Sequence, residues 1–206
     1  MPLLKIHSLG EEKAWALWHM TESESELSEM LEESCPAEIV NEIKRREWLS
    51  GRKLIRILLE SLELQYLGLT KDEFGKPFLK GHPHQISLSH SYPYVAAQID
   101  RDNSVGIDLE QPKEKLRKIA PRVFSKIEVD DAGDNIVKLC IYWCAKEALY
   151  KIYGKRNLLF TDHLLIMPFA MENEGSISGK IQLPEVNTTV SLYYVIMKEF
   201  VIVYTV

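Results

Sequence analysis

The spacing of apolar residues changes along the chain, and this alternation limits the fold more than any single motif. From Ile39 to about Tyr66, apolar side chains recur at helical spacing. This spacing predicts one long helix, with Ser34 as a candidate cap and Gly51 as a candidate break. The segments QISLSHS, VAAQID and SVGIDLE then alternate in polarity or follow at short intervals. They predict the strands of an antiparallel meander.

The second half of the chain repeats this order. Lys115–Phe124 is predicted as a short helix, and Asn135–Tyr153 as an apolar, aromatic-rich helix that Gly154 ends. The segments HLLIM, SISGKIQL, TTVSLYYVIM and EFVIVYTV follow as strands. Helix then sheet, twice, indicates two α+β lobes with a boundary near Asp102–Asn103.

The N-terminal region supplies less pattern. Residues 3–8 are predicted as a short strand. The segment Thr21–Glu33 holds six glutamates and few apolar residues, which is typical of a solvated helical turn or a loop.

Composition excludes several function classes. A net charge of −5 over 206 residues does not favour binding to nucleic acid or to an anionic membrane. The segment after Met1 is too charged for a signal peptide, and no apolar run is long enough to span a membrane. Cys35, Cys140 and Cys144 cannot all pair, so reduced thiols and a cytoplasmic location are expected.

The segment VGIDLE places two carboxylates close together. Asp108 and Glu110 are two residues apart on a predicted strand, so both side chains point to the same face. Two carboxylates on one face repel each other unless a cation lies between them, and Mg²⁺ is a suitable cation. The alternative is a solvated strand end.

The predicted helix segment YWCAKEALYK carries three charged residues among apolar ones. Glu147 and Lys151 are four residues apart and share a face. They form either a surface ion pair or a third metal carboxylate next to lysines, Lys146 and Lys151, that neutralise phosphate charge.

Basic residues gather in the first long helix, although the protein as a whole is acidic. Six residues form this group: Lys44, Arg45, Arg46, Arg52, Lys53 and Arg56. Helical spacing cannot place all six on one face, but a subset such as Arg45, Arg46 and Arg52 could bind a phosphate. Lys76 in FGKPF and His90 in ISLSHS are weak candidates by themselves.

The motifs FGKPF, ISLSHS, VGIDLE, RVFSKIE and WCAKEALYK occur in this order. Together they resemble the 4'-phosphopantetheinyl transferase superfamily, and in particular its two-lobed, single-chain Sfp-type members. The resemblance implies an α+β fold of two pseudo-symmetric lobes, each a long helix packed on a small antiparallel sheet, with the active site in the cleft between them. Residues 1–102 would form the lobe for the adenosine and 3'-phosphate of coenzyme A, and residues 103–206 the lobe with the metal carboxylates.

Roles follow from the resemblance position by position. The metal ligands would be Asp108, Glu110 and Glu147, and the catalytic residues Glu147, Lys151 and Glu110. The general base stays open between Glu147, Glu110 and a metal-bound water, and the role of Glu128 also stays open. The expected contacts to coenzyme A are Arg45, Arg46, Arg52, Lys76, Ser89, His90, Lys146 and Lys151. The motif RVFSKIE departs from the family pattern at Val123, where an aromatic residue is usual.

The activity implied is Mg²⁺-dependent transfer of phosphopantetheine from coenzyme A to a serine of an apo acyl or peptidyl carrier protein, with release of 3',5'-ADP. Carrier proteins of this kind present an acidic helix, which would dock on a basic segment of this chain. This segment holds Lys113, Lys115, Arg117, Lys118, Arg122 and Lys126. A monomer is expected. The alternatives are a protein that binds coenzyme A without catalysis and a Mg²⁺-dependent nucleotide hydrolase, although a Gly-rich phosphate loop is missing.

Overall fold

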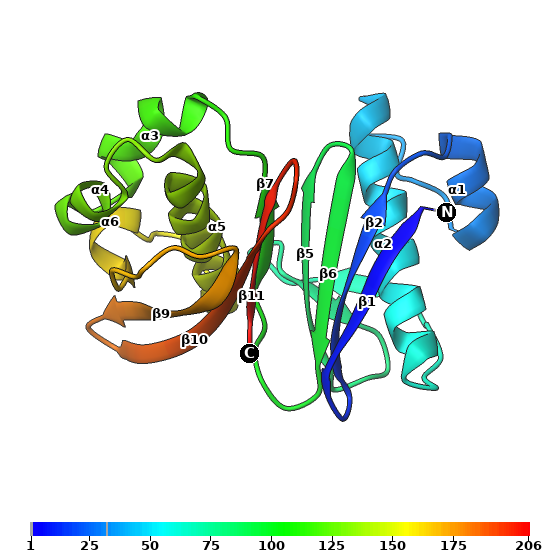
Figure 1. The fold of residues 1–206 in the computed structure, drawn as a ribbon. Helices are drawn as coiled ribbons and strands as arrows, with labels where there is room; N and C mark the ends of the chain where they lie inside the picture. Colours follow the sequence, from blue (N-terminus) through cyan, green and yellow to red (C-terminus); the bar gives the residue numbers. More distant parts are fainter. Residues whose placement is uncertain (1, 32) are drawn as a thin grey trace. The chain divides into compact units, whose positions relative to one another are not determined.

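The computed structural model describes residues 2–31 and 33–206, so that Met1 and Glu32, which fall within the sequence predictions above, lie outside the described residues. The chain divides into two compact units, Met1–Val105 and Gly106–Val206. Each unit combines helices with antiparallel strands (Figure 1). The predicted mixture of helices and sheets is therefore confirmed.

The first unit contains a sheet in the order β1-β2-β6-β5 and a separate β3-β4 pair. Its elements are β1 (Leu3–Gly10), β2 (Lys13–His19), α1 (Glu24–Leu31), α2 (Glu42–Ser61), β3 (Leu69–Lys71), β4 (Pro77–Leu79), β5 (Gln85–Ser91) and β6 (Tyr94–Asp100). Helix α2 packs on the larger sheet, and its buried face fills the core with Leu54, Ile55 and Leu58 (Figure 1).

Helix α2 is continuous and begins later than predicted. The Asn41 side chain accepts a hydrogen bond from the backbone N–H of Lys44 at 3.0 Å and caps the helix. The predicted cap at Ser34 is wrong, because the residues between it and Asn41 are not helical. The predicted break at Gly51 is also wrong. Gly51 is buried inside the helix, where an added Cβ would contact the Leu88 side chain at 3.5 Å.

The acidic N-terminal segment forms a helix that is only partly solvated. The Glu26 carboxylate accepts hydrogen bonds from the backbone N–H and the hydroxyl of Ser23, which fixes the start of α1. Leu27 and Leu31, four residues apart, are buried with Leu49 of α2 in a small apolar cluster. Glu26 and Glu29 are exposed and therefore occupy the outer face of this amphipathic helix.

Strand pairing is the main point on which the prediction fails. β5 and β6 form the predicted antiparallel hairpin, but the third segment of the predicted meander, β7 (Ile107–Glu110), pairs with β11 (Val201–Thr205). Alternating polarity identifies a strand but not its neighbour. β2 was missed because it lies between β1 and β6 and its residues from Ala14 to Trp18 are all buried, which removes the alternation.

The second unit contains a sheet in the order β7-β11-β10-β9-β8. Its other elements are α3 (Lys115–Val123), α4 (Lys126–Ala132), α5 (Ile136–Tyr153), α6 (Phe160–His163), β8 (Leu164–Ile166), β9 (Glu174–Leu183) and β10 (Val186–Ile196). Neighbouring strands in this sheet are antiparallel. The central helix α5 packs on the sheet (Figure 1).

Helix α5 has the predicted ends. Asn135 accepts hydrogen bonds from the backbone N–H groups of Val137 and Lys138, and Gly154 ends the helix with a φ of 70°. The side chains of Leu139, Ala145 and Leu149 are buried in the core of this unit, as the apolar pattern predicts.

Two further findings concern the sequence predictions. Cys35, Cys140 and Cys144 are buried free thiols, as expected. Among the described residues, none of the helices combines the length and apolar character that a membrane crossing requires.

Candidate active site

The start of β7 approaches the backbone of α5 very closely at Gly106. A Cβ at this position would lie 2.1 Å from the carbonyl oxygen of Ala148, closer than any side chain tolerates. Only glycine allows this contact. The contact fixes the strand that carries Asp108 and Glu110 against the helix turn that carries Glu147.

Asp108 is buried and paired with a lysine of α5. Lys151 Nζ lies 2.8 Å from Asp108 Oδ1 and donates a second hydrogen bond to the carbonyl oxygen of Ile107 at 2.7 Å. The lysine side chain is partly exposed, whereas the Asp108 carboxylate is almost fully buried. This pair therefore joins the strand to the last turns of the helix and leaves the lysine accessible to solvent.

Glu110 lies at the end of β7 and also meets a lysine. Its Oε2 atom is 2.8 Å from Lys115 Nζ, and its Oε1 atom accepts a hydrogen bond from the backbone N–H of Gln111. Lys115 begins helix α3 and is exposed. Because its lysine is exposed to solvent, an ion pair of this kind contributes little to stability.

Glu147 is the least satisfied carboxylate of the group. Its side chain forms no hydrogen bond or ion pair with any residue that the structure describes, although it is largely buried. Burial and the negative charges of Asp108 and Glu110 raise its pKa to about 7, while Lys151 opposes the increase. The pKa shift indicates that the three predicted carboxylates interact, so the structure brings them into one electrostatic group.

This donor set fits a hard divalent cation. Mg²⁺ prefers carboxylate oxygens and keeps open positions for phosphate oxygens and water. Among the described residues, no three metal-ligating side chains lie in a ready-made arrangement. Lysines lie beside Asp108 and Glu110. The fit rests on the clustered negative charge and on the unpaired Glu147 carboxylate, which a cation would satisfy.

Lys146 has a different environment from the one expected for a phosphate ligand. Its side chain is 0% exposed, and Nζ lies 2.7 Å from Glu128 Oε2 and 2.7 Å from the carbonyl oxygen of Phe160. Burial lowers the pKa of Lys146, and the Glu128 carboxylate opposes this shift. The ammonium group contacts oxygen atoms of the protein and no solvent. Lys146 therefore lies in the interior of its unit.

Glu128, whose role was left open, joins several elements of the second unit. Its carboxylate accepts hydrogen bonds from the backbone N–H of Ser125 at 2.7 Å and of Ile166 at 2.8 Å, in addition to the ion pair with Lys146. These contacts connect the start of α4, strand β8 and helix α5. Both oxygens of this buried carboxylate therefore have hydrogen-bond partners.

Two of the predicted arginines of α2 are held by acidic residues of their own unit. The Arg45 guanidinium forms a two-point pair with Glu24, at 2.7 and 2.8 Å, and donates to the carbonyl oxygens of Pro36 and Ile39. The Arg52 guanidinium lies over the Trp48 ring and 3.3 Å from a carboxylate oxygen of Glu33. Both side chains thus fasten neighbouring segments to α2.

Arg46 has a less complete set of partners. One nitrogen donates to the carbonyl oxygen of Met20 at 3.2 Å, and the guanidinium lies over the ring of Tyr92. The buried Nε atom has no hydrogen-bond partner among the described residues.

The remaining expected contacts of coenzyme A lie on two segments of the first unit. Ser89 and His90 are on β5, Ser89 buried and His90 exposed. Lys76 precedes β4 and is half-buried, and burial lowers its pKa. The His90 ring also meets Glu47 of α2, a residue that the sequence analysis did not single out.

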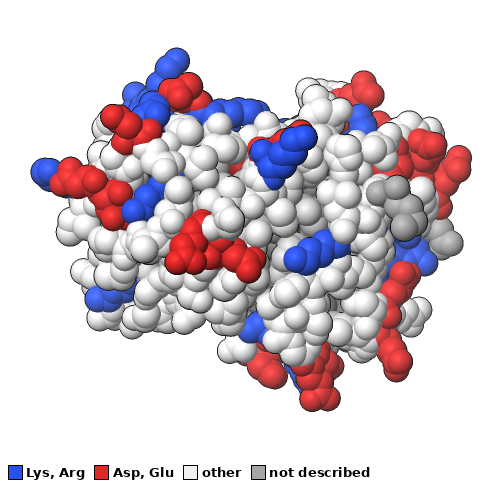
Figure 2. Space-filling view, in the orientation of Figure 1, with Lys and Arg blue, Asp and Glu red and all other residues white. Residues whose placement is uncertain are grey.

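The basic segment predicted for partner docking carries mixed charge. Three of its residues are paired with acidic neighbours: Lys115 with Glu110, Arg117 with Glu114, and Lys126 with Asp130. Among the described residues, Lys113, Lys118 and Arg122 are exposed and form no ion pair. Figure 2 shows positive and negative side chains interspersed over the region of α3 and α4.

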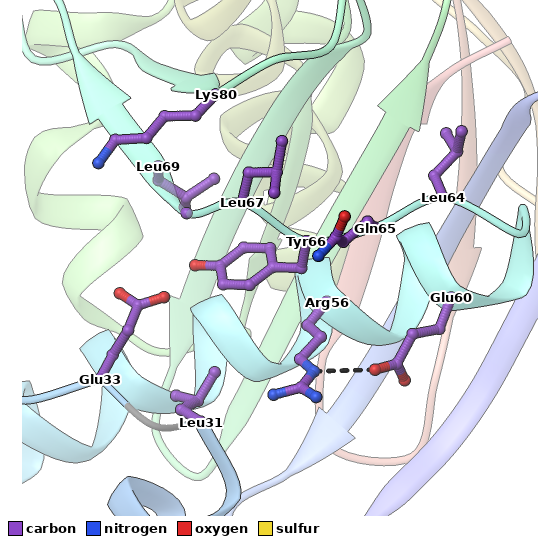
Figure 3. A pocket seen from close by; sticks show the side chains of 11 residues that line it. Leu31, Glu33, Arg56, Glu60, Leu64, Gln65, Tyr66, Leu67, Leu69 and Lys80 are labelled. Carbon is purple, nitrogen blue, oxygen red and sulfur yellow. Dashed lines mark hydrogen bonds and ion pairs between the residues drawn. The ribbon is translucent and has the colours of Figure 1, made fainter.

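The first unit also contains a cavity of about 650 Å³ near the C-terminal half of α2. The side chains of Glu33, Arg56, Glu60 and Tyr66 line it, with Arg56 paired to Glu60 at 2.8 Å (Figure 3). The residues expected to contact coenzyme A are not among its lining residues. Of the expected contacts, Arg52 adjoins the cavity through its ion pair with Glu33.

Comparison with known proteins gives consistent matches. Residues 104–204 match the family model described as the 4'-phosphopantetheinyl transferase superfamily. The chain is 30% identical over 146 residues to 4'-phosphopantetheinyl transferase Sfp of Bacillus subtilis (strain 168), covering 66% of this chain and 62% of the relative. It is 30% identical over 152 residues to 4'-phosphopantetheinyl transferase ffp of Bacillus subtilis, covering 68% and 64%.

A third relative, 4'-phosphopantetheinyl transferase psf-1 of Bacillus pumilus, is 33% identical over 122 residues, which cover 55% of this chain and 52% of the relative. The matched part of the chain thus spans less than two thirds of the length of these relatives. The matched family region contains the carboxylates of β7 and α5 as well as Lys151. The chain belongs to the 4'-phosphopantetheinyl transferase superfamily.

Proposed function

We propose that this protein transfers 4'-phosphopantetheine from coenzyme A to a serine hydroxyl of an apo acyl or peptidyl carrier protein, with Mg²⁺ as cofactor and 3',5'-ADP as the second product. One observation carries the proposal: the Glu147 carboxylate forms no hydrogen bond or ion pair with the described residues, and burial together with the negative charges of Asp108 and Glu110 raises its pKa to about 7. The names of the relatives support the same activity.

Asp108, Glu110 and Glu147 would hold the Mg²⁺ ion. When bound there, Mg²⁺ would neutralise charge on the diphosphate oxygens of coenzyme A. Lys151, which already lies beside Asp108, is suited to bind a phosphate oxygen and to stabilise negative charge on the leaving 3',5'-ADP. Positioning and charge neutralisation would supply most of the rate enhancement.

The serine hydroxyl must lose a proton as its oxygen bonds to the β-phosphorus and the bond to the leaving phosphate breaks. Glu147 is our first candidate for the general base that accepts this proton, because its carboxylate forms no hydrogen bond or ion pair with the described residues. Glu110 is the second candidate, since its carboxylate is paired with the exposed Lys115 and contributes to the raised pKa of Glu147.

The first unit would bind the other end of coenzyme A. We propose that Lys76, Ser89 and His90 hold the adenosine and its 3'-phosphate. Arg46 is the arginine of α2 best suited to join them, because among the described residues no carboxylate forms an ion pair with it, whereas Arg45 and Arg52 are both paired. Arg45 and Arg52 would reach a phosphate only after leaving Glu24 and Glu33.

We further propose that the protein acts as a monomer in the cytoplasm, where its three free thiols would stay reduced. The carrier protein would dock on the exposed cations of α3, in particular Lys118 and Arg122.

Intact mass spectrometry of the carrier tests the activity. The protein is incubated with an apo carrier protein, coenzyme A and Mg²⁺, and a parallel sample contains EDTA. Addition of one phosphopantetheine to the carrier, only with Mg²⁺, is the expected result. An unchanged carrier would contradict the proposal: nucleotide hydrolysis would then favour a hydrolase, and bound coenzyme A without turnover a binding protein.

A further inference from the structure

A buried glutamate of α2 connects a histidine and a lysine of the first unit. The Glu47 side chain is 5% exposed, and its Oε2 atom lies 3.2 Å from Nδ1 of His90 on β5 and 2.7 Å from Nζ of Lys44. His90 and Lys44 are both exposed, at 46% and 57% of their side-chain surface. The carboxylate is thus the enclosed member of a cluster whose other two side chains, an imidazole and an ammonium group, face solvent.

Glu47 is a charged hydrogen-bond acceptor in this cluster. Burial raises its pKa, but hydrogen bonds and charges from His90 and Lys44 outweigh burial, so the pKa lies below its ordinary value. Because a carboxylate oxygen can only accept, the hydrogen between it and the imidazole belongs to Nδ1 of His90. The second ring nitrogen, Nε2, is left for another partner.

We propose that Glu47 is the positioning residue for the 3'-phosphate of coenzyme A: it holds His90 and Lys44 in place so that the imidazole turns its Nε2 edge, and Lys44 its ammonium group, toward that anion. This inference rests on the function proposed above and adds a residue to it. A carboxylate that orients a histidine through its far nitrogen is a general device for tuning that side chain toward a ligand.

The inference makes a prediction of definite sign. Glu47 is negative and lies beside His90, which is expected to contact a phosphate. If Glu47 acted only by repelling that phosphate, its removal would increase the affinity for coenzyme A. Positioning predicts the opposite, because loss of the carboxylate releases the ring of His90 and the Lys44 side chain. The two effects differ most for a ligand that carries the 3'-phosphate.

The experiment compares coenzyme A with 3'-dephospho-coenzyme A as donors for the wild-type protein and Glu47→Gln. For the variant, we expect KM for coenzyme A to rise about tenfold. This is the lower limit of the effect that usually follows loss of a residue that orients a ligand-binding side chain. The KM for 3'-dephospho-coenzyme A and kcat with either donor should stay within about twofold. An unchanged or lower KM for coenzyme A would overturn the inference.

Two controls separate positioning from a general structural effect. Glu60→Gln removes an exposed carboxylate of the same helix that is paired with Arg56, and it should leave both KM values unchanged. In the double variant Glu47→Gln/His90→Ala, the loss should be smaller than the product of the single losses, because both changes remove the same contact. Multiplicative losses would contradict the inference.

A measurement on the wild-type protein remains decisive if the variants do not fold. The imidazole ¹⁵N resonances show which nitrogen of His90 carries the hydrogen. We expect protonated Nδ1 in the free protein and a shift of the Nε2 resonance on addition of coenzyme A but not of 3'-dephospho-coenzyme A. A bare Nδ1, or equal shifts with both ligands, would overturn the inference. If the wild-type protein transfers phosphopantetheine, either failure concerns Glu47 alone and leaves the proposed function standing.

Discussion

Helix α5 carries two lysine–carboxylate clusters only a few residues apart, and they differ in how completely they are satisfied. Lys146 and Glu128 are fully enclosed, and their charged atoms meet each other, two backbone N–H groups and a carbonyl oxygen. Lys151 and Asp108 form the second pair at the edge of a group that also contains the unpaired carboxylate of Glu147.

The difference indicates which cluster maintains the fold and which is available for chemistry. A buried ion pair with all its hydrogen bonds formed is costly to break but offers nothing to a substrate. Carboxylates that lie close together repel one another and destabilise the folded protein. A cation that binds between them removes this repulsion and stabilises the fold. Adjacent residues, Lys146 and Glu147, therefore serve opposite purposes on neighbouring faces of one helix.

Breaking the enclosed cluster should have the largest effect on stability. We expect Lys146→Met to lower the free energy of unfolding by about 3–5 kcal/mol, because Glu128 would remain buried without its cation. Urea unfolding followed by circular dichroism measures this change. Lys151→Met is the comparison variant: it also unpairs a buried carboxylate, Asp108, but it should cost less, because water reaches this pair through the partly exposed Lys151. Equal losses in the two variants would contradict the comparison.

Neutralising Glu147 should have the largest effect on activity in a folded protein. We expect Glu147→Gln to lower transfer at least about 100-fold, as for loss of a proton acceptor and a metal ligand. Coenzyme A binding should only weaken, since under the proposal the adenosine end would be held by residues of the first unit. Stopped-time mass spectrometry of the carrier and calorimetric titration of coenzyme A measure the two quantities. Wild-type turnover would remove Glu147 from the mechanism.

Stability should also depend on the ionisation of Glu147. Its pKa is raised to about 7 in the folded protein, above the value of an unfolded chain, so folding favours the protonated form. Glu147 therefore contributes on the order of 2–3 kcal/mol to the free energy of unfolding below about pH 4.5. This contribution is lost as the pH rises to about 7. Urea titrations in EDTA at several pH values should show this fall in the wild-type protein and not in Glu147→Gln. Parallel pH profiles for the two proteins would contradict it.

Mg²⁺ should stabilise the protein through the unsatisfied cluster. At ten times its dissociation constant, a bound ion adds about 1.4 kcal/mol to the free energy of unfolding. Thermal denaturation with and without Mg²⁺ should show this increase for the wild-type protein and for Glu60→Gln, but not for Asp108→Asn. An equal increase in Asp108→Asn would place the ion elsewhere.

The smallest expected effect concerns the exposed cations of α3. Charge reversal in Lys118→Glu/Arg122→Glu should raise KM for the carrier protein about threefold, more at low salt, and leave coenzyme A affinity unchanged. Lys198→Glu, at an exposed lysine of the same unit, is the control. Charge reversal at Lys115 would be less informative, because Lys115 is paired with Glu110. Unchanged carrier kinetics in Lys118→Glu/Arg122→Glu would remove this surface from the proposal.

The sequence was sufficient for features that local chemistry decides. Both ends of α5 follow from Asn135 and Gly154, and the period-two spacing of Asp108 and Glu110 identified a strand. Pairing of β7 with β11 could not be predicted, because it depends on residues nearly one hundred positions away. The spacing around Gly106 gave no sign that the helix backbone touches it.

Side-chain environments were hardest to predict. Lys146 and Lys151 have the same charge and lie on one helix, and only the tertiary structure shows that Lys146 is enclosed by Glu128 and Phe160. Glu47 was missed because it lies in a run of basic residues, where a lone glutamate resembles an ordinary helix ion pair. A useful signal would have been its spacing from Lys44, which places both on one helix face.

The central claim is that the carboxylates beside Lys151 bind one divalent cation together with coenzyme A. Electron paramagnetic resonance of Mn²⁺, used in place of Mg²⁺, measures free ion directly. With coenzyme A present, we predict that the wild-type protein removes one equivalent of Mn²⁺ from solution and that Glu147→Gln and Asp108→Asn bind it at least about tenfold more weakly. Equal binding by all three proteins, or no binding by the wild type, would contradict the claim.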